Sequence, residues 1–175
     1  TNAGGTIVES GAVLDIDTIT VTDNVTLNGG TLRGTNAGTL AGTLTLGATS
    51  SVVDTATGSD SLTISGVIDD SGSDFGLSKS GAGEAILSGV NTYGGVTAVD
   101  AGTLTASDGA ALGDSGAGNE TTVASTATLN INNVTTAESI TLNGGTLAGT
   151  GTATISSPIT LGAASSTLNT ALVAD

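Results

Sequence analysis

Residues Thr26–Leu32 read TLNGGTL, and the same seven letters return at Thr141–Leu147, 115 residues further along the chain. The match extends without a gap over Thr6–Ala56 and Thr121–Ala171, where 25 of 51 positions are identical. A repeat that is free of insertions keeps the length of every structural layer, so it favours a stacked repeat architecture over one globular core. The chain therefore holds about one and a half copies of a 115-residue unit.

Within each unit, apolar residues alternate with Thr or Ser, as in Val25–Leu27, Leu44–Leu46 and Leu62–Ile64. This period of two places the apolar side chains on one face of a short strand. Gly, Asn and Asp recur every few residues and are typical of turns. No segment has the apolar spacing of a helix, so the chain is predicted to be all-β with almost no α-helix.

Two β architectures fit this pattern: a parallel β-solenoid and a string of antiparallel immunoglobulin-like sandwiches. Sandwich domains usually bury a Trp or a corner Tyr, whereas Phe75 and Tyr93 are the only aromatic residues here and lie between the duplicated segments. The solenoid is therefore favoured. At about 20–25 residues per coil and about 4.8 Å between coils, it would have roughly 7–9 coils and a length of about 35–45 Å.

We expect one solenoid segment over 1–175, in which 1–57 and 116–172 are equivalent parts of the repeat. Leu27 and Leu142 occupy the same place in the two copies, and both are predicted to lie in the interior, about five coils apart. The turns at Asn28–Gly30 and Asn143–Gly145 are predicted to need positive φ angles. Their Asn side chains would stack as a ladder if they occupied equivalent coil positions.

The charge of the chain narrows its partners and its chemistry. The net charge is −14, and Arg33 and Lys79 are the only basic residues, which argues against nucleic acid and anionic membranes as partners. The chain has no His and no Cys, which excludes the usual nucleophilic triads and zinc ligand sets. The absence of Cys is also compatible with secretion. No catalytic or cofactor-binding residue is predicted, and the acidity is interpreted as favouring solubility.

Residues 77–104 resemble the passenger-associated repeat of bacterial autotransporters. The positions that match the pattern of that family are Leu77, Lys79, Gly81, Gly83, Leu87, Ser88, Gly89, Asn91, Thr92, Tyr93, Gly95, Thr97, Val99, Gly102, Thr103 and Leu104. Glu84 and Ala85 depart from the usual Thr-Leu and are expected to weaken one strand. Lys79 and Tyr93 are interpreted as a surface position and a corner position of the repeat, not as ligands.

This resemblance implies a right-handed parallel β-helix that is exported beyond the outer membrane to the cell surface. In that family the repeat is associated with folding and secretion of the passenger and carries no catalytic residues. The leading functional hypothesis is an adhesin stalk, matrix component or surface fibre. The alternative is an inert spacer in a passenger whose enzyme or toxin domain lies outside this segment.

Carboxylates are the only candidates for chemistry. Polysaccharide hydrolysis needs a pair of carboxylates that act as acid and base, and the candidates are Asp69, Asp70 and Asp74, then Asp108, Asp114 and Glu120. The aromatic platforms and basic residues that usually bind sugars are missing, so no enzymatic role is predicted. The Asp69–Asp74 loop offers several oxygens to a calcium ion, but a solvated turn is the favoured interpretation, and no metal site is predicted.

The partners expected from the sequence are coils of the same kind. An uncapped solenoid leaves unpaired backbone groups at each end, and neither 1–5 nor 171–175 has the features of a cap. Flanking coils of the same chain, or other copies of it, are therefore expected above and below. End-to-end self-association of the isolated chain and contact with a host-cell or matrix surface are further expectations.

Overall fold

The computed structural model describes residues 4–170, and in this part of the chain every regular element is a β-strand. No helix among these residues is long and apolar enough to cross a membrane. Three faces build the structure. The first contains β1 (Thr6–Glu9), β4 (Val25–Asn28), β7 (Leu44–Leu46) and β10 (Ile68–Asp69), which form sheet A, and β17 (Thr135–Thr136) and β20 (Thr154–Ile155), which form sheet D.

Two longer sheets make the other faces, with eight strands in each. Sheet B contains β2 (Val13–Asp17), β5 (Thr31–Thr35), β8 (Val52–Asp54), β11 (Leu77–Ser80), β13 (Thr97–Val99), β15 (Thr121–Ala124), β18 (Ile140–Asn143) and β21 (Ile159–Leu161). Sheet C contains β3 (Thr20–Val21), β6 (Ala37–Leu40), β9 (Ser61–Ile64), β12 (Glu84–Leu87), β14 (Thr103–Ala106), β16 (Thr128–Asn132), β19 (Thr146–Thr150) and β22 (Thr167–Thr170).

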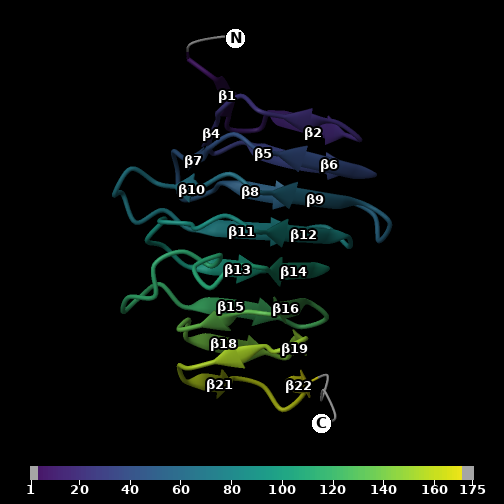
Figure 1. The fold of residues 1–175 in the computed structure, drawn as a ribbon, viewed down its shortest axis with the longest axis vertical. Coiled ribbons are helices and arrows are strands. Elements are labelled where there is room, and N and C mark those ends of the chain that lie inside the picture. Colours follow the sequence, from purple (N-terminus) through teal and green to yellow (C-terminus); the bar gives the residue numbers. More distant parts are fainter. Residues whose placement is uncertain (1–3, 171–175) are drawn as a thin grey trace.

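The chain winds around one axis and adds one strand to each long sheet per coil, so the coils stack from the N-terminal to the C-terminal end (Figure 1). Every pair of these strands is parallel, as between β5 and β8, where Leu32 faces Val53. The eight coils lie within the expected range and confirm the parallel β-solenoid. Their length varies more than expected, from 18 residues between Val13 and Thr31 to 26 between Val52 and Ser78.

Inward-pointing residues form continuous ladders through the coils. The ladder of sheet B runs Leu14, Leu32, Val53, Lys79, Val99, Val123, Leu142 and Leu161. Leu27 and Leu142 both have fully buried side chains, which confirms their predicted interior position. The positions that alternate with these inward residues point to solvent. Thr and Ser are the commonest residues at these outward positions. Lys79 is the one charged member of this apolar ladder.

Sheets A and D occupy the same face of the rod, although two layers between them contain no strand. The Thr92 N–H donates to the Ile68 carbonyl at 2.9 Å, which places 91–93 beside β10. The Asn91 N–H donates to the Ala110 carbonyl at 3.1 Å, which adds the next layer. A Cβ on Gly109 would lie 2.7 Å from the Thr135 oxygen in β17. The first face therefore continues through irregular layers before regular strands resume.

The two copies of the 115-residue unit have the same strand series but lie on different faces. β1 to β8 correspond in sequence to β15 to β22. β1 belongs to sheet A, whereas β15 belongs to sheet B, and β2 belongs to sheet B, whereas β16 belongs to sheet C. One unit therefore advances the chain by five coils and one further face, and the second copy is turned by about a third of a coil.

This offset corrects the predicted Asn ladder, because Asn28 lies in sheet A and Asn143 in sheet B. The Asn28 amide instead donates to Glu9 Oε2 at 2.9 Å. The positive φ predicted for these turns occurs at the first glycine of each pair only, with 82° at Gly29 and 90° at Gly144. The expectation that the chain ends are uncapped falls largely on residues outside the described range and stays a prediction.

Spin labels can test the offset, since the chain has no native Cys. Thr31 and Thr141 point outward from sheet B five coils apart, so their backbones should be separated by about 24 Å. Thr26 lies around the corner in sheet A. Double electron–electron resonance measures the distance between two spin labels. The distance in the double variant Thr26→Cys/Thr141→Cys should therefore be longer than that in Thr31→Cys/Thr141→Cys. The reverse order would mean that both copies lie on one face.

Candidate functional site

The segment that resembles the family pattern, residues 77–104, contains several of the polar side chains that are buried inside the rod. Among the described residues, the buried polar groups of this region are Asp70, Lys79, Asn91, Thr97, Thr105, Thr121, Thr136 and Glu138, together with Tyr93. We call Asp70, Lys79, Asn91, Tyr93, Thr97, Thr121 and Glu138 the buried polar network. It extends from β10 to β18 and surrounds the layers between β10 and β17 in which the first face has no strand.

Lys79 points into the core from β11, so its predicted place on the surface is wrong. Its side chain is fully buried between Val53 and Val99 of the neighbouring coils. The ammonium donates to the carbonyls of Ser80, Gly81 and Ala101 at 2.7, 3.0 and 3.1 Å. Burial lowers the pKa of Lys79 to about 8, and the Asp54 carboxylate opposes this shift. Lys79 thus holds a corner of the rod together, because its ammonium group donates hydrogen bonds to backbone carbonyls of two successive coils.

Asp70 organises the loop that follows β10. Its carboxylate accepts hydrogen bonds from the N–H groups of Gly72, Phe75 and Gly94 at 2.9 to 3.0 Å. Burial favours a higher pKa for Asp70, but these backbone donors outweigh it and hold the pKa below its usual value. A Cβ on Gly94 would lie 2.7 Å from Asp74 Oδ1, so the glycine lets the loop pack against the next coil.

Asn91 takes the place of a strand between two coils of the first face. Its Oδ1 accepts from the Ile68 N–H at 2.8 Å, and its Nδ2 donates to the Ala111 carbonyl at 2.6 Å. The side chain therefore bridges the layer above and the layer below, as a backbone ladder would. Asn91 is almost fully buried. If either hydrogen bond were missing, a polar group would be left without a partner and away from water, which costs free energy of folding.

Tyr93 was predicted to lie at a corner of the repeat. Its side chain is instead fully buried in the interior of the rod. Its hydroxyl lies 2.6 Å from Thr97 Oγ1, which donates onward to the Leu112 carbonyl at 3.2 Å. Gly113 has a φ of 88°, and a Cβ there would come within 2.9 Å of the Tyr93 ring. Burial raises the pKa of Tyr93 well above its usual value. The tyrosine hydroxyl therefore stays protonated and acts as a donor inside the rod.

Glu138 is the acidic member of the network, and sequence reasoning did not single it out. Its side chain is only 2% exposed and lies at the corner before β18. One hydroxyl, from Thr121, donates to its Oε1 at 3.3 Å. Burial raises the pKa of Glu138 to about 7, against the effect of the Thr121 hydroxyl, and the nearby Glu120 carboxylate raises it further. Glu138 therefore holds a proton close to neutral pH.

The six carboxylates considered for chemistry are not gathered in one site, although two of them, Asp70 and Asp74, both lie beside Gly94. Asp69 accepts from the Ser71 N–H and Asp108 from the Ala110 N–H, each within its own turn. Asp114 is exposed and Glu120 half-buried. Within residues 4–170 no three acidic side chains are grouped as a metal would require. The oxygens of Asp70, central to the calcium hypothesis, face backbone donors.

The expected weak strand at Glu84 and Ala85 forms in full. β12 pairs with β9 on one side and with β14 on the other over all four residues. Glu84 faces outward and accepts a hydrogen bond from the Thr105 hydroxyl at 2.5 Å, while Ala85 is fully buried in the ladder of sheet C. A small residue and an outward carboxylate therefore fit the strand, because alternation and not residue size decides its pairing.

Comparison with known proteins agrees with this geometry. Residues 77–106 match the family of passenger-associated-transport-repeats. A curated relative, the adhesin BmaC autotransporter of Brucella suis biovar 1 (strain 1330), is 39% identical over 103 residues, which is 59% of this chain. Residues 77–106 are therefore a repeat of this family, and the chain is similar to a part of that autotransporter adhesin. The matched part spans 3% of the length of that relative, and no solved structure matches this chain significantly.

The role of Lys79 in the stability of the chain can be tested by removing its charge. Lys79→Met keeps a chain of similar length but leaves three carbonyls without their donor, so the free energy of unfolding should fall by about 2–4 kcal/mol. The control is Arg33→Met, which removes a partly exposed ion pair with Asp54 and should cost less than about 1 kcal/mol. Equal losses in urea denaturation would show that the carbonyls do not depend on Lys79.

Glu138 should make the folded chain less stable as pH rises. The carboxyl binds its proton more tightly in the folded chain, where its pKa is about 7, than in the unfolded chain, where its pKa has the ordinary value of 4.5. Its contribution is therefore complete below pH 4.5 and is lost as pH rises to about 7, by roughly 1–3 kcal/mol. The pKa values of Asp60 and Asp70 are lowered, so these groups act at more acidic pH.

The pH effect can be assigned by two matched variants. Glu138→Gln should remove the loss of melting temperature between pH 5 and pH 8, because the amide cannot ionise. Asp23 occupies the same place in the first copy and is exposed, so Asp23→Asn should leave the slope unchanged. If both variants keep the wild-type slope, the burial of Glu138 does not control this titration.

Proposed function

We propose that this chain is a structural display module: a rigid section of an adhesin stalk, matrix component or surface fibre. One observation carries the proposal. In the described part of the chain, the chemically distinctive side chains, Lys79, Tyr93, Asp70 and Glu138, are all buried in the rod. They bind the backbone and hydroxyls of the rod itself. Such an arrangement stiffens a spacer.

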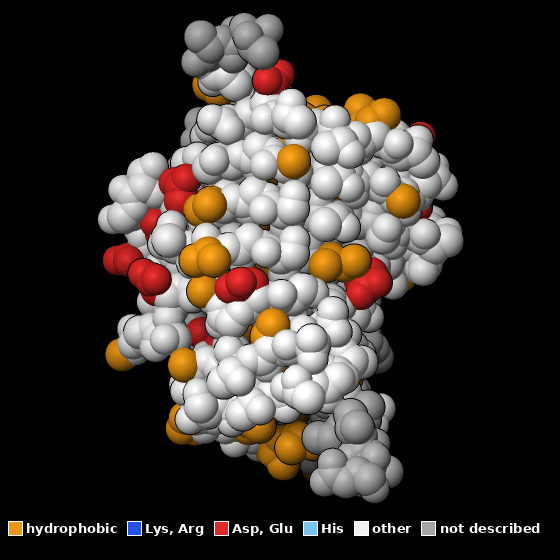
Figure 2. Space-filling model, in the orientation of Figure 1, with side chains coloured by type: hydrophobic (Ala, Val, Ile, Leu, Met, Phe, Trp, Pro, Cys, Tyr) orange, Lys and Arg blue, Asp and Glu red, His pale blue; other side chains and the backbone are white. Residues whose placement is uncertain are grey.

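The surface supports a non-enzymatic role. In the view of Figure 2 it consists mainly of uncharged side chains with scattered acidic groups, and no Lys or Arg is visible. Arg33 is paired with Asp54 and Lys79 is buried, which leaves no free cation among residues 4–170 to bind a phosphate or a sugar acid. We therefore propose neither nucleic acid nor another anionic substrate as a partner.

The proposed partners are coils of the same kind and, beyond them, a host-cell or matrix surface. The location is extracellular or at the bacterial cell surface, as the passenger repeat implies. The curated relative is named an adhesin, which supports adhesion as the task of the whole passenger. Stacked coils contribute reach in proportion to their number, so the length of a stalk is set by repeat count.

Competition distinguishes a stalk from a receptor-binding segment. Bacteria that display the whole passenger would be allowed to adhere to host cells in the presence of excess purified chain. A stalk section contacts no receptor, so the soluble chain should leave adhesion unchanged over a thousandfold molar excess. The matched control is the purified remainder of the passenger, which should compete.

Inhibition of adhesion by the chain of 175 residues would contradict the stalk assignment and would make this segment a receptor-binding part. In that case Lys79→Met would separate folding from binding. A receptor-binding chain should lose competition only to the extent that it loses structure, as followed by circular dichroism.

A further inference from the structure

The two copies of the heptapeptide Thr-Leu-Asn-Gly-Gly-Thr-Leu place the same chemistry in different surroundings. Asn28 and Asn143 are the only asparagines of the chain that are followed by glycine. Each is exposed at the end of its strand, β4 or β18, and the glycine after each has a positive φ, 82° at Gly29 and 90° at Gly144. Glycine has no Cβ, so its backbone nitrogen can approach the side chain of the residue before it.

An asparagine that precedes glycine can lose its side-chain amide without an enzyme. The backbone nitrogen of the glycine loses its proton to water and attacks Cγ of the asparagine, and the Cγ–Nδ2 bond breaks as ammonia leaves. A second water then opens the five-membered imide to aspartate, or to isoaspartate, in which the backbone runs through the side chain. The reaction needs only water and an amide that can rotate toward the next nitrogen.

The first copy holds its amide in place. Asn28 Nδ2 donates to Glu9 Oε2 at 2.9 Å, and the two residues are paired across successive coils. Rotation of the amide toward Gly29 would break this charge-assisted hydrogen bond. An aspartate at position 28 would also face the Glu9 carboxylate, and like charges on directly paired residues are unfavourable.

The second copy lacks both restraints. The residue paired with Asn143 is Ala124, which has no carboxylate. Within residues 4–170 the side chain of Asn143 forms no hydrogen bond. The attacking nitrogen is also only weakly held, because the Gly144 N–H donates to Ser166 Oγ at 3.2 Å, at the long end of such bonds.

We propose that Asn143 is a site of spontaneous deamidation in the folded chain, and that Glu9 protects Asn28 from the same reaction. The heptapeptides around the two sites are identical, so the local sequence gives both asparagines the same reactivity. The difference between them comes from the neighbouring coil. The presence of Glu9 in one copy and of Ala124 in the other therefore decides which copy reacts.

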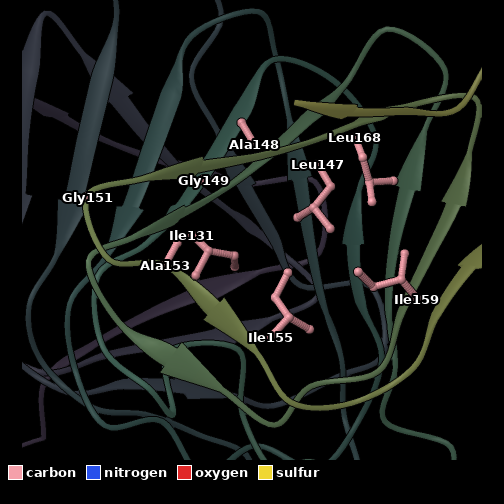
Figure 3. A pocket seen from close by; sticks show the side chains of 9 residues that line it. All are labelled: Ile131, Leu147, Ala148, Gly149, Gly151, Ala153, Ile155, Ile159 and Leu168. Atoms are coloured by element: carbon pink, nitrogen blue, oxygen red, sulfur yellow. The ribbon is translucent and has the colours of Figure 1, made fainter. Parts of the chain in front are cut away.

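Deamidation at Asn143 alters the coil that contains it. Isoaspartate adds a further carbon to the backbone just before Gly145, which is packed so closely that a Cβ would lie 2.5 Å from a carbonyl oxygen of the preceding coil. Leu147 of the same heptapeptide points into the core toward Ile155 (Figure 3). The longer backbone shifts Leu147 against its neighbours, so hydrogen exchange over 140–150 should become faster after conversion.

Both sites can be followed in one sample by peptide mass spectrometry of the purified chain during storage in mildly alkaline buffer. In the folded chain, Asn143 should convert about three- to tenfold faster than Asn28, the factor that one hydrogen bond contributes. In concentrated urea the two sites should convert at equal rates, because their heptapeptides are identical. Fragment ions separate aspartate from isoaspartate, and circular dichroism shows which samples are folded.

Two substitutions exchange the neighbours of the two sites. Glu9→Ala should raise the rate at Asn28 about three- to tenfold and leave the rate at Asn143 unchanged. Ala124→Glu should lower the rate at Asn143 by a similar factor and leave the rate at Asn28 unchanged. Each variant therefore has its control in the other copy. Neither substituted side chain is buried, so both variants should fold.

Three results would overturn the proposal. The first is equal rates at Asn28 and Asn143 in the folded wild-type chain. The second is a pair of folded variants, Glu9→Ala and Ala124→Glu, that keep the wild-type rates. The third is conversion of both sites in urea but of neither in the folded chain, which would show that the fold protects this corner whichever residue faces it.

Discussion

Parallel pairing between successive coils is the constraint on which the rest of this structure depends. A strand in the rod forms its backbone hydrogen bonds only with the strands in the coils above and below it. The side chain of each residue therefore points in the same direction as that of the residue paired with it in the neighbouring coil. Positions that point inward in one coil point inward in the next, and continuous ladders of mainly apolar side chains result. This is why a chain with one Phe, one Tyr and no Trp can still have a continuous core. Small aliphatic side chains suffice when each is covered by the next layer.

The buried polar network occurs where this constraint is interrupted. Two layers of the first face lack strands, and the backbone groups there need other partners. Asn91 bridges both layers with its amide, Asp70 collects three loop N–H groups, and Lys79 supplies three donors to corner carbonyls. A buried charge is costly unless hydrogen bonds surround it, and Asp70 and Lys79 meet that condition. Glu138 has a single donor at 3.3 Å and retains a proton instead.

Sequence patterns predicted what local alternation determines. The all-β class, the solenoid and the interior positions of Leu27 and Leu142 follow from period-two spacing and repeat length, which the coils impose directly. The burial of Lys79 could not be predicted in the same way, since a lone Lys in an alternating strand is usually solvated. Its register signal was present nonetheless, because Leu77 and Lys79 share one face of the strand. Glu138 carried no signal at all, since its conservative counterpart Asp23 is exposed and the two positions look alike in the sequence.

The offset between the copies could not be predicted by comparing their sequences, because the comparison does not show on which face each strand lies. All three faces present similar inward ladders, so a strand such as Val25–Asn28 meets equivalent surroundings when its copy, Ile140–Asn143, moves to the next face. Similarity between copies therefore reports the local environment and not the azimuth around the axis. A unit that advances five coils and one face turns its outward residues by about a third of a circle. Any surface feature carried by such units is therefore displayed on successive sides of the rod.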